Sequence, residues 1–263
     1  MRIALPILLV LTGFGFGRES ISMIHPVSNY VRFNMSAELR DDVYSADMEI
    51  AGEFAPCNCF AIYGDFSYRI VSYEWDTELH DQIHEMVNLR VNGFNETYLG
   101  MKFMPYRFFG IDVSWRFPPG EGSQVNRFHR LGIEPMGLYE FSKTLKLGVS
   151  AAYYTFLESD DFKPGDEVGL KGSLEWNLAQ WDLVHVFVYR WRIQESENLH
   201  MDKPYQKMND LYQGFRMRTD VGRNFAVGDN GMGVFLFYEM NRGSVFGAET
   251  GHTIGLYGKF KFL

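Results

Sequence analysis

Several common protein classes are excluded by what this chain lacks. It has only 2 cysteines and 9 prolines in 263 residues, too few for a disulfide-stabilised small domain or a collagen-like chain. Lysine and arginine number 25 against 33 aspartates and glutamates, which gives a net charge of −8. Because no basic block is available to neutralise phosphates, we expect no nucleic-acid partner.

Long hydrophobic runs are also missing beyond the first residues. No such run reaches the roughly 18 apolar residues of a membrane helix, and the mean hydropathy is −0.19. A helical membrane protein is therefore excluded. A membrane β-barrel is not, because its lipid-facing and lumen-facing residues alternate and average out. The chain is 16% aromatic and has 26 glycines, which favours an all-β fold.

Residues 1–17 have the layout of a secretory signal peptide. Arg2 precedes an apolar run from Ile3 to Leu11, and the segment ends in small residues and Phe before a polar stretch. We therefore predict that residues 1–17 are removed on export and that residues 18–263 form one mature domain. The alternative is a buried first strand or helix of an unexported protein.

From Val31 onward, polar and apolar residues alternate with a period of two, which is typical of strands with one wet and one dry face. In the first stretch Val31, Phe33 and Met35 share one face, whereas Arg32 and Asn34 share the other. The pattern recurs at residues 31–39, 44–54, 60–70, 98–104, 108–117, 128–141, 145–156, 168–178, 181–193, 211–221, 232–240 and 253–263. About twelve strands is an even number, which returns both ends of a membrane barrel to one side.

The connections between these stretches alternate in length, as extracellular loops and periplasmic turns do. We expect long ones at residues 74–96, 118–127, 158–167, 194–210 and 241–252, and tight ones at 56–58, 105–106, 142–144 and 179–180. Two connections break the alternation: a short one at Asp41 and Asp42, and a long one at residues 222–231. Residues 181–193 are apolar on both faces, which a bulge or a packed inner wall would explain.

A secreted β-sandwich also alternates, but it buries its dry face in a core and has short turns throughout. Here the polar faces carry charges of both signs that can pair across strands. Aromatic residues gather near predicted strand ends, as in interfacial girdles. They are Tyr30, Tyr44, Phe54, Trp75, Phe117, Tyr139, Trp176, Trp181 and Trp191. We therefore predict a single closed, antiparallel, up-and-down transmembrane β-barrel.

The last stretch, HTIGLYGKFKFL, is amphipathic and carries aromatic residues near the C-terminus. Here the sequence resembles the bacterial outer-membrane β-barrel family, with a porin-like architecture over the whole mature chain. The resemblance implies location in the outer membrane of a diderm bacterium, contact with outer-membrane lipids, and recognition by the barrel-assembly machinery through Tyr257, Phe260 and Phe262. The family most often ends in Phe, whereas this chain ends in Leu263.

Two groups of charged residues are predicted to line the lumen on nearly opposite walls. The basic group is Arg190, Arg192, Arg216 and Arg218, and the acidic group is Asp47, Glu49, Glu53 and Asp65. Clustered arginines suit carboxylate, sulfate or phosphate groups, so an anion-contacting constriction is expected. The alternative is that these side chains pair with nearer partners such as Glu175, Asp220 or Glu239 and close the lumen.

Two other residue pairs are candidate sites. His80 and His84 have the spacing of neighbours on one helical face and are weak zinc candidates, with two exposed loop histidines as the alternative. Cys57 and Cys59 flank one residue at a predicted periplasmic turn. Export makes their oxidation available, as a redox pair or an intermolecular link, but a bridge over one residue is strained. Turn cysteines without an essential function are the alternative.

No catalytic motif is present: there is no G-x-S-x-G, no P-loop and no His–Ser pair of the outer-membrane phospholipase type. We expect no cofactor. The function predicted from the sequence is a channel for passive passage of small polar solutes, including anions. The alternatives are a plugged barrel with a structural or adhesive role, and a lipid-modifying enzyme.

Overall fold

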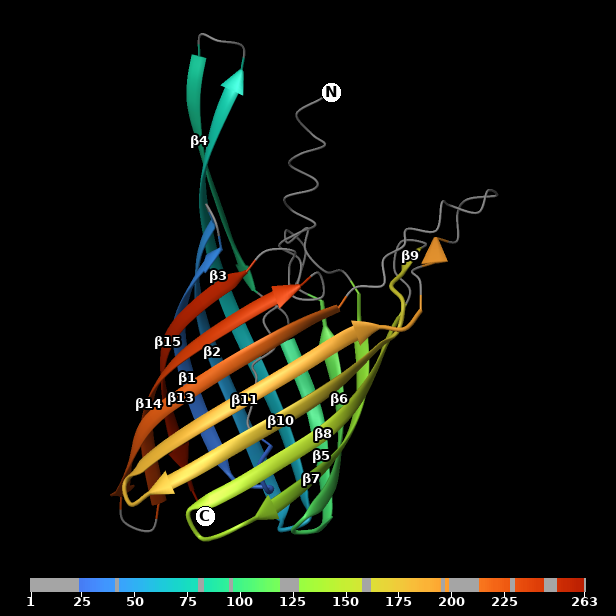
Figure 1. The fold of residues 1–263 in the computed structure, drawn as a ribbon, viewed down its shortest axis with the longest axis vertical. Helices are drawn as coiled ribbons and strands as arrows, with labels where there is room; N and C mark the ends of the chain where they lie inside the picture. The colour runs from blue at the N-terminus through green and yellow to red at the C-terminus, as the bar shows by residue number, and fades with distance from the viewer. Residues whose placement is uncertain are drawn as a thin grey trace.

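Figure 1 shows the fold of the chain in a computed structural model. The structure describes residues 24–40, 43–79, 83–94, 97–118, 128–157, 162–194, 197–198, 213–227, 230–243 and 250–262. The strands are β1 (Tyr30–Arg40), β2 (Val43–Cys57), β3 (Phe60–Leu79), β4 (Ile83–Phe94), β5 (Thr97–Tyr106), β6 (Phe109–Phe117), β7 (Arg130–Glu140), β8 (Leu145–Phe156), β9 (Phe162–Lys163), β10 (Glu167–Leu178), β11 (Trp181–Arg192), β12 (Glu197–Asn198), β13 (Gln213–Val227), β14 (Asn230–Gly243) and β15 (Gly251–Lys261). Within these ranges no helix is long and apolar enough to cross a membrane.

Twelve of the described strands close into an antiparallel barrel, as predicted. Each strand pairs with its neighbour in the chain, with β4, β9 and β12 outside the cylinder, and β15 pairs with β1 to complete it. Figure 1 shows the strands tilted against the long axis, the C-terminus at the end with the short hairpins, and the strand ends that lead into the long connections at the other end. By the length rule for such barrels, these are the periplasmic and extracellular ends.

The outer surface of the barrel is apolar because alternate residues of every strand point outward. On β1, Val31, Phe33 and Met35 are each nearly half exposed, whereas Arg32 and Asn34 are buried in the lumen. An apolar surface of this extent is unfavourable in water but is stabilised by lipid. Tyr44, Phe54, Tyr139 and Trp181 of the predicted girdle lie on this surface. Tyr30 does not: it faces the lumen and is only 7% exposed.

Two predicted connections are wrong in extent. Residues 222–231 are not a long turn, because β13 runs to Val227 and β14 begins at Asn230. The predicted loop at residues 74–96 is largely β-structure: β3 continues to Leu79 and pairs with β4 in a hairpin that rises above the barrel (Figure 1). The predicted loop at 194–210 contains the short β12, which pairs with β9. Its remaining residues from 199 onward lie outside the described ranges.

The lumen is packed most densely along β11 and β13–β15. Val184 and Val186 of β11 are buried with Val188 against them, so a packed inner wall explains why that strand is apolar on both faces. Phe235, Phe237 and Tyr257 form a second buried cluster on β14 and β15. Buried charged residues such as Arg190, Arg216 and Glu239 lie on the same strands, so apolar and polar side chains share this part of the lumen.

Candidate functional site

The N-terminal residues 24–29, here called the N-terminal segment, lie inside the barrel rather than outside it. Ile24 and His25 are 5% and 9% exposed. The backbone N–H of Ser28 donates to Glu53 Oε1 at 2.8 Å, and the backbone N–H of Ala55 donates to Asn29 Oδ1 at 2.7 Å. The lumen thus contains a piece of backbone that the strand pattern does not reveal.

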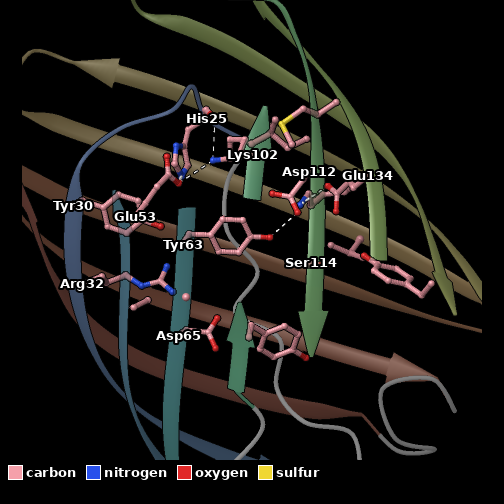
Figure 2. Close-up of a pocket in the computed structure, with 18 of the residues that line it drawn as sticks. His25, Tyr30, Arg32, Glu53, Tyr63, Asp65, Lys102, Asp112, Ser114 and Glu134 are labelled. Carbon is pink, nitrogen blue, oxygen red and sulfur yellow. Dashed lines mark hydrogen bonds and ion pairs between the residues drawn. The ribbon is translucent and has the colours of Figure 1, made fainter. Parts of the chain in front are cut away.

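A cavity of about 130 Å³ occupies the middle of the lumen and reaches from β1 across to β8 and β11 (Figure 2). Its charged lining is mixed. The basic residues are Arg32, Lys102, Arg130, Lys171 and Arg216, and the acidic residues are Glu53, Asp65, Asp112 and Glu134. Such a cavity holds water and small polar solutes, since nearly every wall offers a hydrogen-bonding or charged group.

Most of this lining is already paired in the structure. Lys102 Nζ lies 3.0 Å from Glu53 Oε2 and Lys171 Nζ lies 2.7 Å from Glu134 Oε1. The hydroxyl of Tyr63 donates to Asp112 Oδ1 at 2.6 Å, and Figure 2 shows that ring crossing the lumen toward Asp112. The pairs fix the side chains that surround the cavity.

Asp47, Glu49 and Glu53 of the predicted acidic wall are buried in the lumen and are held by basic partners. Asp47 accepts a bidentate contact from Arg69 of β3, with Nε and Nη2 at 2.7 and 3.0 Å. Glu49 contacts Arg32 of β1. Asp65 lines the central cavity. This wall therefore presents balanced charge rather than a continuous negative surface.

The predicted basic group separates into two parts. Arg216 lies 3.2 Å from Glu239, and Arg218 Nε lies 2.6 Å from Asp220 Oδ1, so these two arginines pair with the nearer partners named as the alternative. Arg190 and Arg192 share one carboxylate, Glu167, at 3.6 and 3.3 Å. Arg216 thus pairs across strands with Glu239 of β14, and Arg218 pairs with Asp220 of its own strand, β13. Arg190 and Arg192 belong to a larger group.

That larger group, here called the arginine cluster, consists of Arg116, Arg130, Arg190 and Arg192. Arg116 and Arg130 are directly opposite each other on β6 and β7. Arg192 is directly opposite Glu167 on β11 and β10. All four arginines are buried in the lumen and lie within two residues of a strand end that leads into a long connection. The cluster therefore occupies the extracellular half of the lumen.

Tyr154 of β8 organises the cluster. The guanidinium carbons of Arg130 and Arg190 lie 4.4 and 4.5 Å from the centroid of its ring. The ring lies along the wall because Gly132 is opposite it on β7, where an added Cβ would be 2.9 Å from the ring. Cation–π contacts of this kind hold two arginines close together and reduce their mutual repulsion.

Sequence reasoning missed Arg116 and Arg130. Both alternate correctly with the apolar residues of their strands, so each is recognisable as lumen-facing. However, only the register between β6 and β7 brings them together, and that register cannot be read from either strand alone. Glu167 was missed for a simpler reason, because it was placed in a loop whereas it is the first residue of β10.

The residues of the predicted assembly signal do not share one face. Phe260 is 40% exposed on the outer surface, whereas Tyr257 is buried in the lumen and donates its hydroxyl to Asp220 Oδ2 at 2.8 Å. The backbone N–H of Phe262 donates to the carbonyl of Asn29 at 3.2 Å. Recognition of these residues by the assembly machinery stays a prediction.

The remaining candidates are placed as follows. The predicted signal peptide, residues 1–17, and His80 lie outside the described residues. The proposed helical face for the histidine pair is wrong, since His84 belongs to β4, opposite Glu78. Among the described residues, no group of three or more possible metal ligands comes together. Cys57 and Cys59 are exposed free thiols at the β2–β3 turn, with their Sγ atoms 2.8 Å apart.

Comparison with known proteins shows the fold of this chain. No family model and no curated protein matches it. Among solved structures, an outer membrane channel from Pseudomonas putida is similar with a TM-score of 0.61 at 8% identity, over 93% of this chain and 99% of that one. The NanC porin is similar with a TM-score of 0.55 at 6% identity, over 88% and 100%. The fold of this protein is therefore a closed twelve-stranded β-barrel with an apolar exterior, similar to the folds of outer-membrane porins and channels.

Proposed function

We propose that this barrel is a passive channel for small polar solutes that carry negative charge. The observation that supports the proposal most directly is the arginine cluster in the extracellular half of the lumen. Four guanidinium groups lie there, and two of them, those of Arg190 and Arg192, contact the same carboxylate, Glu167. By contrast, Lys102, Lys171, Arg216 and Arg218 each contact a carboxylate of their own.

The chemistry of the cluster fits anions better than neutral solutes. A guanidinium group offers several N–H donors in a plane and binds carboxylate, sulfate or phosphate oxygens in pairs. Inside a narrow lumen its field is screened less than at a surface, so it raises the local concentration of anions and their entry rate. The central cavity, on the periplasmic side of the cluster, is lined by residues of both charges. Their contacts with a solute are individually weak enough for the solute to leave.

A flux experiment tests this proposal. Purified protein is reconstituted into liposomes, and swelling rates are compared for an anionic and a neutral solute of similar size. The double variant Arg116→Gln/Arg130→Gln removes two charges of the cluster at nearly constant side-chain length. We expect it to reduce entry of the anion several-fold and to leave the neutral solute nearly unchanged.

The matched control is Arg223→Gln, because Arg223 is exposed on the outside of β13, where it donates to Gln180. It should leave both rates unchanged. If Arg116→Gln/Arg130→Gln reduces the entry rates of both solutes equally, the arginines only shape the lumen. An anion preference that survives in that variant would contradict the proposal.

One observation favours a second function, a closed barrel with a structural role. The N-terminal segment and the paired charges fill much of the lumen cross-section, and the cavity between them is small. If the barrel has only a structural role, the liposomes should swell with neither solute. This should hold for the wild type and for every variant designed to open the lumen.

A further inference from the structure

The N-terminal segment is anchored to the barrel wall by specific polar contacts. Glu53 of β2 receives the N–H of Ser28 on one oxygen, and the ammonium group of Lys102 is 3.0 Å from the other. His25 Nε2 is 3.7 Å from the same oxygen, and Lys102 also reaches the His25 carbonyl at 3.5 Å. Figure 2 shows His25, Lys102 and Glu53 meeting at the upper edge of the cavity.

The segment also has an apolar anchor on the far wall of the lumen. Ile24 packs against Gly148 of β8, and a Cβ added at Gly148 would lie 2.7 Å from Ile24 Cβ. The neighbouring residue in register on β10 is the small Ser173. Small residues at these two positions leave a notch that the Ile24 side chain fills.

The two anchors lie on different walls, so the segment crosses the lumen. β2 and β5 carry the polar anchor, whereas β8 carries the apolar one. On one side of the crossing lies the central cavity. On the other lies a cavity of about 550 Å³, lined by Pro26 and Val27 together with residues of the periplasmic turns such as Asn58 and Phe108. Ile24 lines both cavities.

We propose that the N-terminal segment is a gate that closes the channel from its periplasmic side. Docked as in the structure, it separates the central cavity from the periplasmic cavity and blocks solutes larger than water. Release of Ile24 and His25 joins the two cavities into a continuous path. The inference rests on the proposed channel function, since a gate has meaning only where solutes pass.

The physical arrangement suits a reversible gate. The segment continues directly into β1, so it stays tethered at a high effective concentration and rebinds without diffusing away. No strand of the barrel has to break for it to leave, because the described hydrogen bonds of residues 24–28 to the wall go to side chains and not to a strand ladder. Opening therefore requires only local undocking.

The first experiment removes the gate. A variant lacking residues 18–27 keeps residues 1–17 for export and keeps Ser28 and Asn29 next to β1. We expect its single-channel conductance in a planar bilayer to be several-fold higher than that of the full mature chain. Heat-modifiable migration in gels confirms folding of both proteins. Equal conductance of the two folded proteins would overturn the gate.

The second experiment locks the gate without shortening the chain. Ile24→Cys and Gly148→Cys are introduced together in a Cys57→Ser/Cys59→Ser background, and each single variant serves as the control. Their Cβ atoms start close enough for a disulfide after a small shift. Oxidation should lower the conductance and reduction should restore it in the double variant only. A current that is the same before and after reduction, with the disulfide verified by mass spectrometry, contradicts the proposal.

The two proposals fail in different ways. If the shortened chain and the full chain both carry no current, the channel function is wrong. If both carry the same anion-selective current, the channel function holds and the gate is wrong. If the shortened chain has a higher conductance than the full chain, both proposals are supported.

Discussion

Glu53 Oε1 accepts a hydrogen bond of 2.8 Å from the backbone N–H of Ser28, and this contact joins the N-terminal segment to the second strand of the barrel. The carboxylate is buried, and its other oxygen faces Lys102. One side chain therefore neutralises a lysine of the lumen and also holds the segment that crosses it. The consequences for gating, acidity and stability can each be measured.

Replacement Glu53→Gln should loosen the N-terminal segment. The amide keeps an acceptor for Ser28 but leaves Lys102 without its counter-charge, and breaking a buried pair in this way costs about 3–5 kcal/mol where water is excluded. We expect a higher open probability in bilayer recordings and a lower thermal midpoint. Glu175→Gln is the control, because its partner Lys146 is 3.8 Å away and one-third exposed, so the loss should be below about 1 kcal/mol.

Acidification should also favour the open state. Burial, and then the charges of Lys102, Lys259 and Lys261, hold the pKa of His25 well below 6.5 in the docked segment. The carboxylate nearest to His25 is that of Glu53, and the ring of Tyr30 packs against the His25 ring. The docked state thus binds fewer protons than the released state, so docking is fully favourable above pH 6.5 and weakens progressively as the pH falls below it.

Bilayer conductance recorded between pH 8 and pH 5 checks this expectation. The current of the wild type should rise on the acidic side, whereas His25→Phe should remove most of that rise. A rise of the same size in the variant would assign the pH dependence to another group.

Asp220 is expected to be important for the stability of the packed side of the lumen. It accepts bonds from Arg218 Nε and Nη2 at 2.6 and 3.2 Å and from the Tyr257 hydroxyl at 2.8 Å. Asp220→Asn removes the carboxylate charge that contacts Arg218, which is buried beside Phe237, at a cost of about 3–5 kcal/mol. Thermal unfolding in detergent measures the loss. Tyr238→Phe, which removes an exposed hydroxyl, should change stability by no more than about 1 kcal/mol.

The exposed thiols of Cys57 and Cys59 report the orientation of the barrel. They lie at a short turn, and short turns face the periplasm. After mild reduction, a bulky membrane-impermeant maleimide should label both cysteines in permeabilised cells but neither in intact cells. Labelling in intact cells would place this end of the barrel outside and reverse the assignment of the arginine cluster.

The wall of the barrel is predictable from the sequence because alternation is a local property of each strand. Phe33 must face outward if Arg32 faces the lumen, because successive residues of a strand point to opposite faces. The same alternation holds in every strand that has one apolar and one polar face. Strand ends are harder to predict, since alternation does not say where pairing stops. β13 therefore continues to Val227 through residues that seemed to form a turn in the sequence.

The site was predictable only in part, because its contacts depend on the register between strands and on a segment without regular secondary structure. Arg216 and Arg218 are buried in the lumen, where the register between β13 and β14 places Glu239 beside Arg216, and the side-chain directions on β13 bring Asp220 to Arg218. The N-terminal segment has no periodicity that marks it as lumenal. Its position depends on the notch at Gly148 and on the charge of Glu53, residues that are distant in the chain.

The anion preference of the lumen can be measured as a reversal potential in a salt gradient. The variant lacking residues 18–27 is placed in a planar bilayer between two concentrations of potassium chloride, two ions of nearly equal mobility. We expect a measurable current whose reversal potential indicates preference for chloride over potassium. The double substitution Arg116→Gln/Arg130→Gln should shift that potential toward zero. A folded variant that carries no current, or one whose reversal potential indicates preference for potassium, would contradict it.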